Sequence, residues 1–71
     1  MKEKKLFGKI LKNLRKDKGI SQGMVAECVG VSQQCVSQWE NGQIEPTLTF
    51  LWRLADFFDI SVDELIGRKD F

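Results

Sequence analysis

The chain has 71 residues, 42% of them apolar, which suffices for one small domain but leaves no room for a core beside a separate catalytic cleft. It has no histidine, no secretory leader and no apolar run approaching about 18 residues, so the sequence argues against an enzyme, a secreted protein and a membrane protein, and we expect a cytoplasmic one. The formal net charge of +1 is uneven, because residues 1–18 carry eight Lys or Arg against two acids and residues 19–71 carry three against eight.

Residues 5–18 form the first predicted helix. Apolar residues recur there at the spacing of one helical face, at Leu6, Phe7, Ile10, Leu11 and Leu14. Gly19 follows as a typical helix stop. The lysines of this segment form either a solvated face or a positive rim that meets phosphate, and charge alone does not decide between the two.

Two short helices follow. Ser21 is the predicted N-cap of a helix over residues 22–29, and Ser32 that of a helix over residues 33–41. Gly30 and Gly42 end these helices. A linker of residues 30–32 that contains a glycine is typical of a helix-turn-helix, although other small helical bundles have similar corners.

A fourth helix is predicted over residues 48–58 after Pro46, with an apolar stripe at Leu48, Leu51, Leu54, Ala55 and Phe58. Ser61 caps a short fifth helix over residues 62–66, which Gly67 ends. No segment alternates with period two for long enough to form a strand. The sequence therefore predicts an all-α, compact five-helix bundle: a single domain over residues 1–71, with its core at about 5–66 and short tails at 1–4 and 67–71.

The third predicted helix has two contrasting sides. Val36 and Trp39, flanked by Cys35, point toward the core, whereas the opposite arc is polar and uncharged, with Gln34, Ser37, Gln38 and Asn41, and Gln33 in the exposed first turn. An amide can donate and accept at once, which suits the adenine edge in the major groove of DNA. The alternative is a polar solvent face with no further role.

The two cysteines, Cys28 and Cys35, cannot complete a four-ligand zinc site without histidine, and a disulfide is not expected in a reducing cytosol. We therefore expect free thiols, with no metal and no cofactor. No small-molecule ligand is evident from the sequence.

Residues 14–46 read L-R-x-x-K-G-I-S-Q-x-x-V-A-x-x-V-G-V-S-Q-Q-x-V-S-Q-W-E-N-G-x-x-x-P, and residues 59–65 read D-I-S-V-D-E-L. In these positions the chain resembles the Cro/repressor-type (xenobiotic-response-element type) helix-turn-helix family, from about residue 10 to 65. It is especially similar to the DNA-binding domains of lambdoid phage repressors. The resemblance implies a lambda-repressor-like fold in which the second and third helices form the helix-turn-helix.

The resemblance also implies a site for double-stranded DNA. Base edges in the major groove would be read by Gln33, Gln34, Ser37 and Gln38. Phosphates would be bound by Gln22, Asn41, Gly42 and Gln43, with Lys5, Lys9 and Lys12 as peripheral charge. The loop after Gly42 lacks the basic residues that many relatives carry, and Glu45 should repel phosphate.

Arg15 and Glu40 each lie four residues after an apolar residue, at the edge of a buried face, where a charge needs a partner. The family pairs these two positions, so we expect a structural ion pair between the first and third helices. The alternative is two unrelated charges at the rim.

The end of the chain is unusually aromatic. It provides a candidate dimer patch of Phe50, Trp52, Phe57, Val62, Leu65, Ile66 and Phe71. The alternative is a thick core with partly exposed rings. Because one helix-turn-helix makes few base contacts, we expect a homodimer that reads half-sites about 34 Å apart on a pseudo-palindromic operator.

These patterns together predict a sequence-specific DNA-binding transcriptional regulator, and specifically a repressor that occludes a promoter. The alternative is an antitoxin or anti-regulator type of protein-interaction module, whose aromatic surface binds a different protein and whose DNA binding is secondary. The operator sequence and the regulated genes do not follow from the residues.

Overall fold

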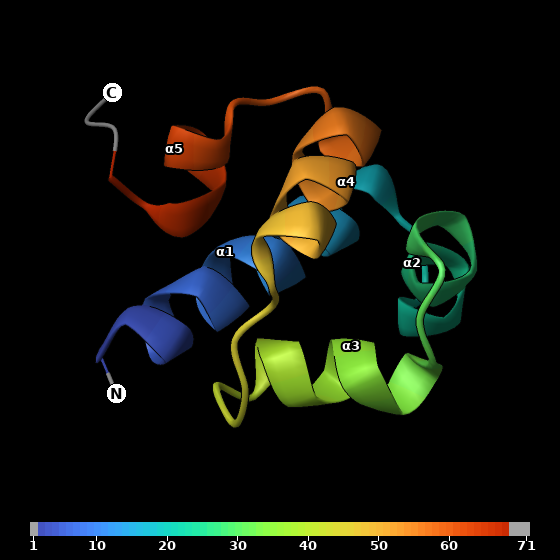
Figure 1. Cartoon of the computed structure of the whole chain (residues 1–71). Helices are drawn as coiled ribbons and strands as arrows, with labels where there is room; N and C mark the ends of the chain where they lie inside the picture. Colours follow the sequence, from blue (N-terminus) through green and yellow to red (C-terminus); the bar gives the residue numbers. More distant parts are fainter. Residues whose placement is uncertain (1, 69–71) are drawn as a thin grey trace.

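The computed structural model describes residues 2–68, which form five helices and no strand: α1 Lys2–Lys18, α2 Gln22–Val29, α3 Gln33–Glu40, α4 Leu48–Phe58 and α5 Val62–Ile66 (Figure 1). The predicted all-α bundle is confirmed. Helix α1 begins three residues earlier than predicted, because the Lys-Glu-Lys start favours a helix before the apolar pattern begins. Helix α3 ends one residue earlier, at Glu40.

Serine side chains cap three of the helices. The hydroxyl groups of Ser21, Ser32 and Ser61 accept hydrogen bonds from backbone N–H groups three residues later. Ser61 and Glu64 also form a reciprocal capping box. At the corner between α2 and α3, Gly30 has φ +87°, a left-handed conformation that glycine adopts without steric cost. The helix-turn-helix corner is therefore fixed by local chemistry.

The core lies between the five helices. Its fully buried side chains come from all five helices: Leu11, Val25, Val36, Trp39, Leu54 and Leu65. Burial of each contributes on the order of 1.5–3 kcal/mol. Trp39 is 1% exposed, so it anchors α3 in the core as predicted.

Two leucines of the predicted apolar stripes are exposed instead of buried. Leu48 is 57% exposed, because it is the first residue of α4 and lies beyond the part of the helix that packs. Leu6 is 42% exposed and lies at the edge of α1, beside Gly67 at the end of α5. A helical wheel places both residues on the right face but does not show where neighbouring helices end.

Helix α3 lies along one edge of the molecule, with α2 at its beginning and the loop to α4 at its end (Figure 1). It packs against α1 and α2, whereas α4 packs on α2 and α5, and α5 on α1. This arrangement supports α3 from one side and leaves its other side open.

Candidate nucleic-acid interface

The open side of α3 carries the predicted base-reading residues. Gln33 and Gln34 are exposed at the start of the helix, and Ser37 and Gln38 are half-buried further along. The next residue on this side, Asn41, is exposed and donates only a long contact of 3.5 Å to the Ser37 hydroxyl. Within residues 2–68, the side-chain amides of the three glutamines make no hydrogen bond, so their donors and acceptors are unpaired.

Arg15 and Glu40 form the predicted ion pair. The Arg15 Nε donates to Glu40 Oε2 at 2.7 Å and its Nη2 to Glu40 Oε1 at 3.1 Å. The side chain of Glu40 is only 2% exposed. The hydrogen bond to Glu40 raises the pKa of Arg15 above its ordinary value, while burial acts in the opposite direction. The guanidinium therefore stays charged, and the pair fixes α3 to α1.

Gln22 adds a third helix to this network. Its side-chain Nε2 donates to Glu40 Oε1 at 3.1 Å, so one buried carboxylate joins α1, α2 and α3. Gln22 was predicted to bind phosphate. Phosphate accepts hydrogen bonds, so only the second Nε2 hydrogen and the backbone N–H of Gln22 remain for that role.

The loop after α3 lies against α1. Gly42 has φ +73°, and a Cβ there would lie 3.2 Å from Lys5 Cα. The structure thus brings Lys5 beside Asn41, Gly42 and Gln43, where phosphate binding was predicted. Lys9 and Lys12 are exposed one and about two turns further along α1.

Gly8 is a structural residue that the sequence analysis missed. It is buried, and a Cβ there would lie 2.6 Å from the carbonyl oxygens of both Trp39 and Glu40. A glycine inside a strongly helical pattern was the available signal, since it costs helix stability unless packing requires it. Its position brings α1 into close contact with the end of α3.

The predicted dimer patch needs correction. Leu65 is fully buried, so it belongs to the core and cannot contact a second molecule. Four other members are half-buried and pack against the core: Phe50, Phe57, Val62 and Ile66. Phe71 lies outside the described residues. Of the described members, only Trp52, which is 57% exposed, is a prominent surface residue.

Two further exposed apolar residues lie near Trp52 in the sequence. Leu48 is one helical turn before it, and Ile44, 36% exposed, lies in the loop that precedes α4. We call Ile44, Leu48 and Trp52 the α4 apolar patch. The patch begins in the loop that follows α3.

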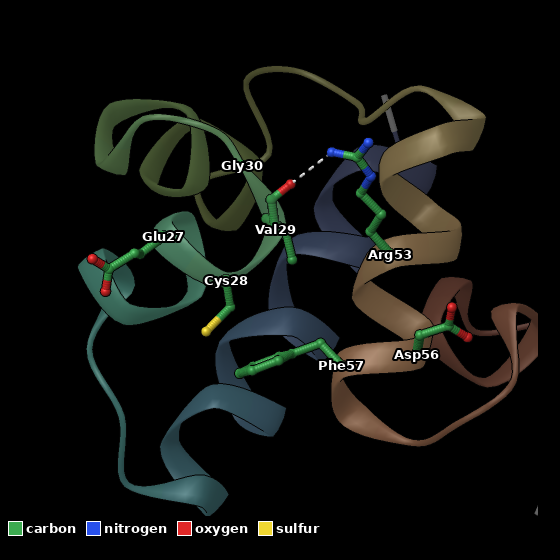
Figure 2. Close-up of a pocket in the computed structure, with 7 residues that line it drawn as sticks. All are labelled: Glu27, Cys28, Val29, Gly30, Arg53, Asp56 and Phe57. Atoms are coloured by element: carbon green, nitrogen blue, oxygen red, sulfur yellow. Dashed lines mark hydrogen bonds between the residues drawn. The ribbon is translucent and has the colours of Figure 1, made fainter.

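A shallow hollow lies between α2 and α4 (Figure 2). On its upper side the Arg53 Nη1 donates to the Val29 carbonyl at 3.2 Å, which satisfies a carbonyl at the end of α2. Cys28 points toward Phe57. Both cysteines are free thiols, as expected. Arg53 was not predicted to support the helix-turn-helix, because its partner is a backbone group of another helix.

Among residues 2–68, no group of three or more acidic, His or Cys side chains could hold a metal ion. In the same part of the chain no helix is both long and apolar enough to cross a membrane. Neither observation adds a further site to the one on α3.

The comparisons with known proteins agree with this geometry. A family model described as helix-turn-helix matches residues 11–65. The chain belongs to this helix-turn-helix family. The predicted resemblance to Cro/repressor-type proteins and the lambda-repressor-like fold are thereby confirmed.

Among curated relatives, the uncharacterized HTH-type transcriptional regulator y4dJ of Sinorhizobium fredii is 37% identical over 70 residues, which cover 99% of this chain and 91% of the relative. The chain spans between 31% and 60% of the length of four other curated relatives. These relatives therefore contain further sequence beyond the shared region.

Two solved structures share the fold with a TM-score of 0.85. The restriction-modification controller protein C.AhdI from Aeromonas hydrophila is 34% identical, with 92% of this chain and 98% of that protein covered. The P22 c2 repressor, solved in complex with a synthetic operator, is 33% identical, with 90% and 97% covered.

Proposed function

We propose that this helix-turn-helix chain is a sequence-specific, double-stranded DNA-binding transcriptional regulator that acts as a repressor. The observation that carries the proposal is the open side of α3, whose exposed amides are uncharged and unpaired while its other side is anchored by Trp39 and Glu40. The names of the relatives and the operator complex of the P22 c2 repressor support it. Under this proposal the chain acts in the cytoplasm and has no enzymatic activity.

In the proposed complex α3 enters the major groove, where Gln33, Gln34, Ser37 and Gln38 contact base edges. A glutamine can bind adenine N6 and N7 in a bidentate fashion, so sites that contain A·T pairs are favoured. Phosphates on one side of the groove meet the N-terminus of α2 and Gln22. Those on the other side meet Lys5, Asn41 and the backbone of Gly42 and Gln43, with Lys9 and Lys12 as outer charge.

We further propose that two copies bind a pseudo-palindromic operator through contact between their α4 apolar patches. Three exposed apolar side chains are few compared with the roughly 20–30 residues a side of a standard interface. The patch therefore favours a weak dimer that DNA binding completes. Because the patch begins in the loop that follows α3, an isologous contact there holds the two α3 helices near each other for adjacent half-sites.

The direct test is selection of binding sites from random duplex DNA, followed by native mass spectrometry of the selected complex. We expect an A·T-containing inverted repeat with half-sites about one helical turn apart and two protein copies per duplex. Enrichment of no motif would refute sequence-specific binding, and one copy on a duplex with two half-sites at saturating protein would refute the dimer.

The α4 apolar patch also supports a second candidate function, in which Trp52 binds a different protein. Trp52→Ala distinguishes the two. On an operator with two half-sites, it should remove cooperative binding while the affinity for a single half-site stays the same. If cooperativity survives the substitution, the patch is not the dimer contact and the protein-interaction function gains support.

A further inference from the structure

Helix α1 touches the end of α3 at a point where only a glycine fits. A Cβ on Gly8 would lie 2.6 Å from the carbonyl oxygens of Trp39 and Glu40, whereas ordinary contact begins at 3.4 Å. The obstructing atoms are backbone atoms at the end of a packed helix, so they cannot rotate away as a flexible side chain can. An alanine at residue 8 must therefore separate α1 from the end of α3.

A second close contact lies beside the first. The backbone of Lys5 and its Cγ lie 3.2 and 3.1 Å from the position of a Cβ on Gly42. Lys5 and Gly8 are three residues apart and so lie on the same face of α1. This face of α1 therefore follows the end of α3 and the loop after it, with a glycine at each of these two contacts.

A hydrogen bond joins the two contacts. The Trp39 carbonyl, which faces Gly8, accepts the backbone N–H of Gly42 at 3.2 Å. A displacement of α1 at Gly8 is thus transmitted to the loop at Gly42 as well as to Lys5. The backbone of Lys5 and the backbone of the loop are therefore held in contact.

We propose that Gly8 is a positioning residue for phosphate binding, which acts by placing the Lys5 amine beside the loop that follows α3. The inference rests on the proposed DNA binding and adds to it a residue that touches no DNA. Lys5 has no cationic neighbour in that loop, since residues 19–52 contain no Lys or Arg. Its placement therefore determines how strongly this edge of the interface attracts phosphate.

A double-mutant cycle with Gly8→Ala and Lys5→Ala tests the proposal. In the native background, Lys5→Ala should weaken binding to specific and non-specific duplexes alike. It should also reduce the slope of log affinity against log salt by about 0.9 per bound copy. In the Gly8→Ala background, Lys5→Ala should change neither quantity further. An undiminished effect of Lys5→Ala in that background would overturn the proposal.

Gly8→Ala could also weaken DNA binding by lowering the stability of the fold, so a control must separate this effect from a displaced Lys5. Phe58→Leu, a core substitution at the far end of α4, serves as the matched control, and each affinity is corrected for the folded fraction from circular dichroism. In this control the full effect of Lys5→Ala should remain. If Gly8→Ala does not fold, Gly42→Ala presses on Lys5 from the opposite side and should likewise reduce the effect of Lys5→Ala.

Failure of the inference can be separated from failure of the proposed function. If Gln34→Ala alters base preference while Lys5→Ala alone has no effect on affinity, DNA binding stands and the role of Gly8 is refuted. If no variant and no duplex sequence changes the affinity, both the proposed function and the inference are refuted.

Discussion

Glu40 is the residue on which the placement of α3 depends. Its carboxylate accepts hydrogen bonds from Arg15 and Gln22, and each donor lies on a different supporting helix. Taking such a charge out of water is costly, and the bidentate guanidinium offsets that cost. A buried pair of this kind is weak evidence for net stability. The pair does fix the orientation of α3, because a rotation of this helix would break all three hydrogen bonds to Glu40.

The glutamines on the open side of α3 should determine sequence preference. Gln34→Ala removes an exposed amide without altering the core, so we expect a loss of about 1–3 kcal/mol on the preferred site and a relaxed preference at one base pair. Competition binding with single-base variants of the selected operator measures both effects. Equal weakening on every sequence would contradict a base-reading role.

The two cysteines should differ in reactivity. Burial raises the pKa of the Cys35 thiol, whereas Cys28 is exposed. Since the thiolate is the reactive form, a raised pKa leaves less of it at a given pH. At pH 8 we expect iodoacetamide to modify Cys28 well before Cys35, as followed by peptide mass spectrometry. Faster modification of Cys35 would show that its site opens readily.

At the scale of the helices, the cap of α3 should link stability to base preference. The Ser32 hydroxyl accepts the Cys35 N–H at 3.1 Å, in the turn that carries Gln33 and Gln34. We expect Ser32→Ala to cost about 1 kcal/mol of unfolding free energy and also to weaken base preference, because this turn frays. Urea unfolding and competition binding measure the two effects.

Ser61→Ala is the matched control for that prediction. Ser61 caps α5 through the same type of hydrogen bond, at 3.0 Å to the Glu64 N–H, but α5 lies away from α3 (Figure 1). This variant should lose a similar amount of stability and keep its base preference once corrected for folded protein. Equal loss of preference in both variants would mean that general destabilisation explains the effect of Ser32→Ala.

The helices could be predicted because serine caps, glycine stops and apolar periodicity are local signals. The Arg15–Glu40 pair could also be predicted, because each residue lies at the edge of a buried face and the family pairs these two positions. By contrast, Gly8 and the bond from Gln22 to Glu40 depend on which helices meet. The burial of Leu65 and the exposure of Leu48 depend on where neighbouring helices end. A helical wheel of one helix does not show this.

At the scale of the whole molecule, charge and recognition are separated. The cationic residues cluster on α1, whereas residues 19–52 contain no Lys or Arg. Under the proposed function, the open side of α3 discriminates between bases, and α1 supplies the general attraction to DNA. Glu45, which is exposed in the loop after α3, should oppose that attraction.

This separation predicts a shallow salt dependence of DNA binding. Each neutralised phosphate contributes about 0.9 to the slope of log affinity against log salt. If the lysines of α1 supply the phosphate contacts, two bound copies should give a slope no steeper than about −8. Fluorescence anisotropy between about 50 and 200 mM salt measures this slope.

Glu45→Lys should steepen the slope, and Glu45→Gln serves as the control that removes the negative charge without adding a cation. A native slope steeper than −8 would mean that cations outside α1 neutralise phosphate, and the assignment of attraction to α1 would be wrong.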